Sequence, residues 1–259
     1  MKFGISNIAW NKLDDDYFIE HLYNNNIKFL EVAPTKISEN PYDNYEQFSN
    51  YLKKLNGKLE VISIQSIAYG INYNLFRNFE ENKLFFEHIM KVLKFADNFK
   101  IPNIVFGCPK NRNIENPANI ELGINFFKSL DKELDKFNTT LSLEPNPEIY
   151  GTNFLNNTFQ VIDFINYNEL NNIKLNFDFG SFELNKEKFD SIDNYINLIN
   201  HVHISKPNLE YTDNYERIDL LLQKLNELNY SKTISFEIKE HPKFKVEEII
   251  KLITKYENI

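Results

Sequence analysis

Four segments that are otherwise apolar each end in a side chain that can bind a metal ion or move a proton. The four residues are Glu144, Asp178, His203 and Glu237. A buried carboxylate in such a place is costly unless it is paired or bound to a cation, although any one of these acids alone would fit an ordinary salt-bridged or solvated strand end. Together, three carboxylates and an imidazole offer the oxygen and nitrogen donors that suit Mn²⁺ or Mg²⁺, with Co²⁺ or Zn²⁺ as alternatives. The set therefore predicts a divalent-metal site, provided that the fold brings the four segment ends together.

Short β-type segments that alternate with amphipathic segments must position these residues. The predicted strands are residues 2–8, 28–33, 59–65, 103–107, 140–144, 174–178, 201–205 and 233–237. The amphipathic segments have the apolar spacing of helices packed on a sheet, and they include residues 42–55, 80–98, 120–137, 154–167, 213–228 and 246–256. This alternation requires a parallel sheet. Eight units with no linker between them predict a single (β/α)8 barrel over residues 1–259 rather than an open doubly wound sheet.

A barrel of this kind carries its chemistry at the carboxyl ends of the strands, so the four residues are expected around one pocket. His201 and His203 are two residues apart on one strand and point the same way. His203 is nearer the mouth and is the expected ligand, whereas His201 is expected inside the barrel or in support of the ligand. Weaker candidates for the pocket wall and for substrate contact are Asn7, Trp10, Glu31, Gln65, Asn146 and Tyr150.

The loop after the fourth strand carries Lys110 and Arg112, which are candidates for binding a phosphate or another anionic group. Arginine offers a planar fork of donors and lysine a point charge. Lys206 could join them. A solvated basic loop is the alternative interpretation, just as a packing role is the alternative for Trp10 as an apolar wall against a sugar.

Composition and charge exclude several classes of partner. The 37 acidic and 29 basic residues give a net charge of −8, which argues against nonspecific binding to nucleic acid or to an anionic membrane. No apolar run approaches the ~18 residues of a membrane span. Cys108 is the one cysteine, so an intramolecular disulfide is excluded. We therefore expect a cytoplasmic protein that acts on a small molecule.

At the predicted strand ends the chain resembles the xylose-isomerase-like barrel superfamily, specifically its sugar phosphate isomerase/epimerase family. The segments that carry the resemblance are residues 4–10, 30–36, 106–112, 143–147, 177–180, 201–205 and 235–237. The resemblance implies that Glu144, Asp178, His203 and Glu237 bind one divalent metal. The chain departs from the family pattern at residues 180–182, where many relatives have a histidine, and at Lys206, where an acidic residue is common. The first departure removes a usual substrate contact, and the second suggests a more anionic or differently placed substrate.

The resemblance also implies a mechanism on a sugar or sugar phosphate. A ketose that chelates the metal through its carbonyl and adjacent hydroxyl would have its neighbouring C–H acidified and the resulting enediolate stabilised. Glu144 and Glu237 are then the acid/base pair as well as ligands. Return of the proton to the opposite face of the same carbon gives epimerisation, and return to the neighbouring carbon gives aldose–ketose isomerisation.

Three other functions remain open. A sugar or cyclitol dehydratase of the same barrel begins with the same proton abstraction. An abasic-site endonuclease-like hydrolase would need a three-zinc site rich in histidine and a basic face, which the five histidines and the net charge of −8 disfavour. A non-catalytic sugar-binding barrel would be marked by loss of a ligand, and none is lost here. The sequence also leaves open the sugar, the native metal and whether the chain forms a homo-oligomer.

Overall fold

A computed structural model describes residues 1–210, 216–241 and 246–257, and it shows eight parallel strands that close into a barrel. The strands are β1 (Lys2–Ser6), β2 (Phe29–Val32), β3 (Glu60–Ile64), β4 (Asn103–Phe106), β5 (Thr140–Leu143), β6 (Ile173–Asp178), β7 (Ile199–Ile204) and β8 (Thr233–Phe236). Closure is made by β1 and β8, where Lys2 pairs with Thr233 and Ile5 with Phe236. The predicted (β/α)8 architecture is confirmed.

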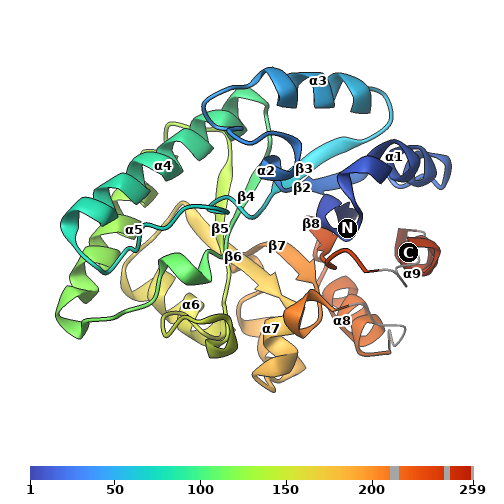
Figure 1. The fold of residues 1–259 in the computed structure, drawn as a ribbon. Helices are drawn as coiled ribbons and strands as arrows, with labels where there is room; N and C mark the ends of the chain where they lie inside the picture. Colours follow the sequence, from blue (N-terminus) through green and yellow to red (C-terminus); the bar gives the residue numbers. More distant parts are fainter. Residues whose placement is uncertain (211–215, 242–245, 258–259) are drawn as a thin grey trace.

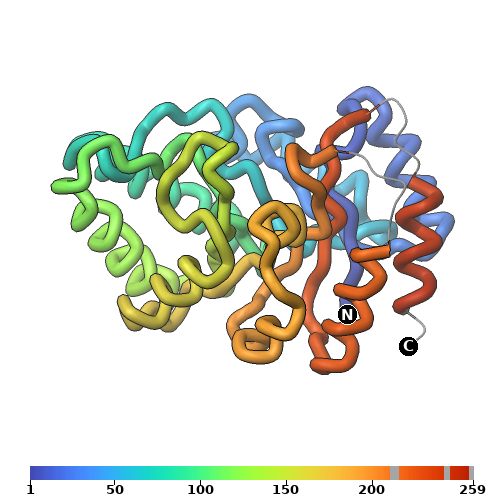
Figure 2. Tube along the Cα trace, turned by 90° about the horizontal axis from the view of Figure 1, so that it is seen from below, coloured from blue at the N-terminus to red at the C-terminus, as the bar shows by residue number. Residues whose placement is uncertain are grey.

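Helices surround the barrel on its outside, as Figure 1 shows. They are α1 (Asp15–Asn24), α2 (Pro34–Ile37), α3 (Glu46–Leu55), α4 (Phe79–Asn98), α5 (Ile120–Leu134), α6 (Thr158–Tyr167), α7 (Phe179–Leu184), α8 (Glu216–Glu227) and α9 (Val246–Glu257). In Figure 2 the amino terminus lies beside α9, the helix that packs against β1. No helix among the described residues is long and apolar enough to cross a membrane.

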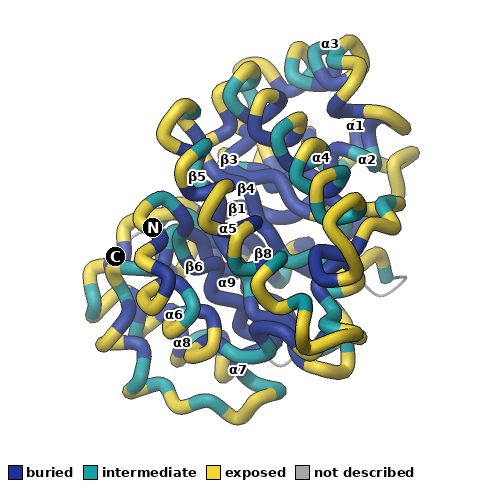
Figure 3. Tube along the Cα trace, turned by 90° about the vertical axis from the view of Figure 1, so that its left-hand side faces the viewer, coloured by how far each residue is buried: buried dark blue, intermediate teal, exposed yellow. Residues whose placement is uncertain are grey.

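The strands are largely buried, as Figure 3 shows, and the side chains on their two faces differ in chemistry. Side chains alternate along a strand, so one set packs outward against the helices and the other points into the barrel. The outward set is apolar: Phe106 of β4 meets Phe85 of α4 and Phe127 of α5 with ring centroids 6.0 and 5.3 Å apart. The inward set is polar, as the hydrogen bond of 2.6 Å from Ser142 to Asn103 illustrates.

Several predicted boundaries shift where a capping side chain starts a new element. The first predicted strand, 2–8, ends at Ser6, because the Ser6 hydroxyl accepts a hydrogen bond from the Ile8 backbone N–H and begins a 3₁₀ turn. The predicted helix 154–167 begins only at Thr158, where the Asn157 side chain caps the helix by accepting from the Gln160 N–H. The first residues of the predicted helix 213–228 lie outside the described residues.

Candidate metal and active site

Four side chains from neighbouring strands meet at the carboxyl end of the barrel. Asp178 is the last residue of β6, His203 lies on β7, and Glu144 and Glu237 directly follow β5 and β8. One potential ligand atom from each of the four lies within 4.8 Å of the others. Nδ1 of His203 is 2.9 Å from Oε1 of Glu144 and 3.1 Å from Oε2 of Glu237. The structure therefore brings together the set that the sequence selected.

Hydrogen bonds hold the carboxylates in place. Glu144 accepts one of 2.7 Å from the Asn176 amide and one of 3.1 Å from the Asn146 amide. Asp178 accepts one of 2.6 Å from the Ser205 hydroxyl and another of 2.6 Å from the Ser181 backbone N–H. These supporting contacts fix where the carboxylate oxygens point.

A glycine on the adjacent strand end leaves room for Glu144. A Cβ atom at Gly107 would lie 2.5 Å from Oε2 of Glu144. Any larger residue at this position would therefore displace the carboxylate from the cluster.

The donor set fits a bound cation. Nδ1 of His203 is buried and has no well-aligned hydrogen bond among the described residues, although it faces Glu144 and Glu237. Nε2 of the same ring is turned to the carboxylate of Glu31. A buried ring nitrogen surrounded by carboxylates in this way is the environment that a divalent ion with oxygen and nitrogen ligands requires.

The electrostatics of the cluster shift the pKa values of its two glutamates in opposite directions. Burial, with the charges of Glu144 and Asp178, raises the pKa of Glu237 to about 7, against the opposing effect of His203. Burial acts to raise the pKa of Glu144 too, but the close contact with His203 and the hydrogen bond from Asn146 outweigh it, and the pKa lies below its usual value. Two carboxyl groups with pKa values shifted in opposite directions are the pattern expected of an acid and a base that act together.

A cavity of about 550 Å³ extends from the cluster to the loops that follow β3 and β4. Besides the four cluster residues, it is lined by the sequence-predicted Gln65, Lys110, Asn146 and Tyr150. Tyr150 is held by the Asn208 backbone N–H, which donates a hydrogen bond of 2.8 Å to its hydroxyl oxygen. Ser181, in the segment 180–182 where the sequence departs from the family pattern, also lines the cavity.

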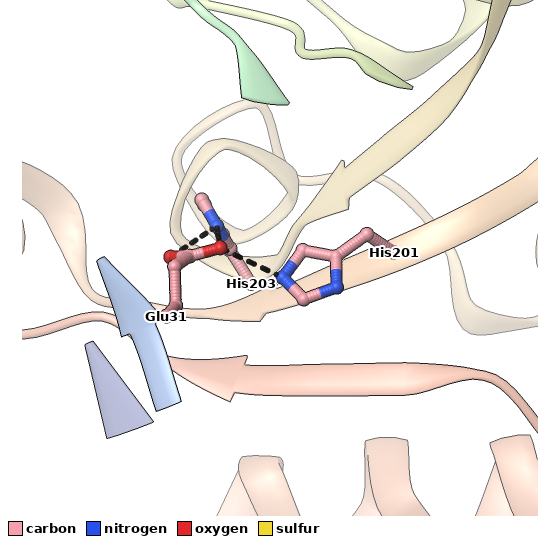
Figure 4. A group of neighbouring side chains, drawn as sticks. All are labelled: Glu31, His201 and His203. Carbon is pink, nitrogen blue, oxygen red and sulfur yellow. Dashed lines mark hydrogen bonds and ion pairs between the residues drawn. The ribbon is translucent and has the colours of Figure 1, made fainter. Parts of the chain in front are cut away.

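Three predicted contact residues from the first half of the barrel are not among the residues that line this cavity. The Asn7 side chain accepts a hydrogen bond of 2.9 Å from the Ala33 N–H. The Trp10 indole donates one of 2.7 Å to Asp15, and the ring is almost fully buried. Glu31 is buried behind His203 and contacts that histidine instead (Figure 4).

Two of the three cations expected at an anion site also turn away from the cavity. Arg112 is fully buried, and its guanidinium donates to the Glu144 backbone oxygen. Lys206 lies 3.8 Å from the Glu183 carboxylate and above the ring of Phe179. Lys110 is the one lysine or arginine among the described residues that line the cavity.

Of the residues that orient the carboxylates, Asn146 was among the sequence candidates, whereas Asn176, Ser181 and Ser205 were not. Asn176 precedes Asp178 by two positions on β6, so both side chains point into the barrel. That spacing is a signal that could have identified Asn176. Ser205 has the same relation to His203 but lies just beyond the end of β7, where alternation no longer fixes the direction of a side chain.

Comparison with known proteins adds a family and a set of similar folds. The family model described as xylose isomerase-like TIM barrel matches residues 19–256. No curated protein matches the sequence. Similar solved structures include the 3-keto-D-glucoside 4-epimerase YcjR of E. coli, with 15% identity over 100% of both chains and a TM-score of 0.78.

Two further structures resemble the chain at similar identity. A D-psicose 3-epimerase of Clostridium cellulolyticum has 18% identity and a TM-score of 0.72, covering 100% of this chain and 92% of its own. The probable 3-DHS dehydratase AsbF of Bacillus anthracis also has 18% identity, with a TM-score of 0.70, covering 100% of this chain and 99% of its own. At these identities the likeness shows the fold.

Proposed function

The chain belongs to the xylose isomerase-like TIM barrel family, and from that premise we propose that it is a divalent-metal-dependent sugar isomerase or epimerase. The observation that carries the proposal is the convergence of Glu144, Asp178, His203 and Glu237 within 4.8 Å at the floor of a cavity. The epimerases among the structural neighbours support the same reaction class. Mn²⁺ or Mg²⁺ suits a site with three carboxylates and one imidazole.

The chain's own residues supply the proton transfer. A bound cation would polarise the substrate carbonyl and stabilise the negative charge that develops on it. Glu144, with its lowered pKa, is suited to accept the proton from the carbon beside the carbonyl. Glu237 faces the same site from the end of β8 and is suited to deliver a proton, and the two exchange roles in the reverse reaction.

The cavity offers polar groups for hydroxyls and one cation for an anionic group. The Tyr150 hydroxyl can donate to a sugar, and the side-chain oxygens of Gln65 and Asn146 can accept from one, because the NH2 groups of both amides already donate within the protein. Lys110 is the candidate contact for a phosphate. The substrate is therefore a small sugar or sugar phosphate, bound with its reacting carbons toward the four-residue cluster.

The probable dehydratase among the similar structures favours a second candidate, a sugar or cyclitol dehydratase. In such a reaction Glu237, once protonated, would give its proton to a leaving hydroxyl. Proton abstraction by Glu144 would then end in loss of water rather than in reprotonation of carbon. The dehydratase among the structural neighbours has the same fold.

Exchange of solvent deuterium into substrate tests the proposal before any product is known. The Mn²⁺-loaded protein is incubated in heavy water with a panel of ketoses, keto-glycosides and their phosphates, and mass spectrometry follows the incorporation of deuterium. We expect one deuterium at the carbon beside the carbonyl of the accepted sugar, and none with His203→Ala. Elimination of water without deuterated starting sugar would favour the dehydratase. No reaction with any member of the panel would contradict proton transfer on a sugar.

A further inference from the structure

Glu31 lies on β2, fully buried, between two histidines of β7, as Figure 4 shows. Nε2 of His203 is 3.0 Å from Oε1 of Glu31, and Nε2 of His201 is 3.0 Å from Oε2. An ionised carboxylate only accepts hydrogen bonds. Nε2 of His203 therefore carries the hydrogen that it shares with Glu31, whereas Nε2 of His201 lies within ion-pair distance of Oε2 without a well-aligned hydrogen bond.

Two further contacts complete the surroundings of this carboxylate. The Gln65 amide donates a hydrogen bond of 3.1 Å to Oε1 of Glu31. On the far side of His201, Nδ1 lies 2.6 Å from the Thr233 hydroxyl oxygen, and this hydrogen bond holds the ring. Glu31 thus faces two ring nitrogens of β7 and the amide of Gln65, which directly follows β3, and it does not line the cavity.

The hydrogen on Nε2 of His203 has a consequence at the opposite ring nitrogen. An imidazole that binds a cation is neutral and keeps one ring hydrogen, so with that hydrogen on Nε2 toward Glu31, Nδ1 presents a lone pair to the space that Glu144 and Glu237 also face. We infer that Glu31 is a positioning residue: it fixes the tautomer and the orientation of His203 so that Nδ1 is offered to the cation. His201, held by Thr233, in turn holds Glu31. The inference rests on the proposed metal site and reassigns Glu31 from substrate contact to support of a ligand.

The same three residues could instead be a second cation site, since Glu31, His201 and His203 also place one potential ligand atom each within 4.8 Å of one another. The hydrogen bonds argue against this. Every ring nitrogen that faces Glu31 must be deprotonated before it can bind a metal, whereas the described contacts already satisfy the carboxylate. The expected stoichiometry is one cation per chain.

Calorimetric titration with Mn²⁺ tests the inference without reference to activity. Glu31→Gln keeps the size of the side chain but replaces one accepting oxygen with a donor that opposes a histidine N–H. We expect it to weaken Mn²⁺ binding by about 10- to 100-fold, as is typical when the hydrogen-bond partner of a ligating histidine is lost. Glu187→Gln is the matched control. Glu187 is a half-buried carboxylate outside the cavity lining that accepts from the Thr158 N–H and hydroxyl, and its variant should bind Mn²⁺ like wild type.

Nitrogen-15 NMR of the Mg²⁺-loaded protein reports which ring nitrogen of His203 carries the proton. If Glu31 only stabilised the fold, this proton position would not change in a Glu31 variant. In wild type, His203 should show its proton on Nε2, and in Glu31→Gln that proton should be lost from Nε2 or exchange rapidly with solvent. His201→Asn, which removes the ring that contacts Glu31, should weaken Mn²⁺ binding in the same direction but less. If Glu31→Gln does not fold, His201→Asn provides the test. Unchanged Mn²⁺ affinity in that variant would overturn the inference.

The outcomes separate this inference from the proposed function. Unchanged Mn²⁺ affinity and an unchanged His203 Nε2 proton in Glu31→Gln would overturn the positioning role and leave the metal site intact. Two Mn²⁺ ions per wild-type chain, reduced to one in Glu31→Gln, would replace it with a second metal site. A wild-type protein that binds no Mn²⁺ or Mg²⁺ would overturn the proposed function, and the inference with it.

Discussion

Nη2 of Arg112 donates a hydrogen bond of 2.7 Å to the backbone carbonyl oxygen of Glu144. The guanidinium is fully buried, and its Nε and Nη1 atoms have no hydrogen-bond partner among the described residues. Burial lowers the pKa of Arg112 to about 10, while Cys108 and Glu144 act in the opposite direction. The positive charge therefore lies behind the end of β5, where it helps to lower the pKa of Glu144.

This placement predicts how Arg112→Met will behave toward substrates. Because the side chain does not line the cavity, the loss of its charge should act through Glu144 and lower kcat/KM by the same factor for a sugar and for its phosphate. Steady-state kinetics with a matched pair of substrates measures the ratio. A selective rise in KM for the phosphate would instead place Arg112 at the anion.

Lys110 is the contrasting case, since it is exposed and lines the cavity. Lys110→Ala should raise KM for a phosphorylated substrate by roughly 10- to 100-fold, the equivalent of one charge-assisted hydrogen bond of about 1.5–3 kcal/mol. KM for the uncharged sugar should change little. Equal effects on both substrates would remove Lys110 from the anion site.

The contrast between Lys110 and Arg112 shows what sequence could and could not predict. The two residues are two positions apart in a loop that the sequence correctly placed at the pocket mouth. Between β4 and Arg112 the chain passes through Cys108 in a left-handed conformation, with φ of 50°, and then a 3₁₀ turn over Pro109–Asn111. That turn directs one cation to the cavity and the other into the protein. Periodicity carries no information about such a turn, whereas it predicts strands and strand ends well.

The contact between Glu31 and His203 could not be predicted from the sequence for a different reason. The two residues are 172 positions apart and belong to β2 and β7, which are not hydrogen-bonded neighbours in the sheet. Alternation along each strand shows that both side chains point inward, but not which inward residues meet across the barrel. The four-residue cluster was easier to predict because its members come from four consecutive strands, β5 to β8.

One divalent ion should bind per chain, and His203 should be needed for it. His203→Ala removes the nitrogen ligand and leaves three buried carboxylates, so Mn²⁺ affinity should fall by 100-fold or more, beyond the ~10- to 100-fold loss typical of a supporting residue. Calorimetry of the purified protein measures the Mn²⁺ affinity, and elemental analysis measures the number of ions bound per chain. His88→Ala, which alters a histidine that bonds the Ile67 backbone oxygen, is the control. Equal Mn²⁺ binding by wild type and His203→Ala would show that the ligand assignment is wrong.

Mn²⁺ binding should tighten as pH rises through about 7. In the metal-free protein Glu237 has a pKa of about 7, raised mainly by burial, so below that pH a bound cation must displace its proton. The apparent affinity should therefore fall by up to about tenfold for each pH unit below 7 for this one proton. Titrations in buffers of different ionisation enthalpy count the protons released. A pH-independent affinity between about pH 5 and pH 8 would contradict the raised pKa.

The raised pKa of Glu237 also determines whether the metal-free protein gains or loses unfolding free energy as pH rises. The folded-state pKa of Glu237 lies above its ordinary value of 4.5, so the stabilisation from this group is complete below pH 4.5 and is lost as pH rises through about 7. The free energy of unfolding should fall by up to about 1.4 kcal/mol per pH unit across that window on account of Glu237. Urea titrations with and without Mn²⁺ measure it. Because the ion stabilises the charged carboxylate, the fall should be smaller when Mn²⁺ is present.

Glu144 and Glu237 should each be needed for turnover as a proton-transfer pair. Replacing either with Gln keeps its shape and one oxygen donor but removes the base, and should lower kcat by about 10²–10⁴-fold. The mutants must first be shown to hold metal, because each glutamate belongs to the ligand cluster and a metal-free variant would be inactive for that reason alone. Elemental analysis after Mn²⁺ loading supplies this control.

Solvent exchange then separates the roles of the two glutamates. If Glu144 abstracts the proton in the direction assayed, Glu144→Gln should lose both product formation and deuterium incorporation into the starting sugar. Glu237→Gln should stop product formation but allow exchange, because Glu144 can still return a solvent-derived proton to the face from which it came. Reversal of the assay direction should exchange the two phenotypes, since in a two-base epimerase the acid of one direction is the base of the other. Near wild-type turnover in both directions by either metal-loaded variant would contradict the paired mechanism and leave a one-base or dehydratase mechanism as the better account.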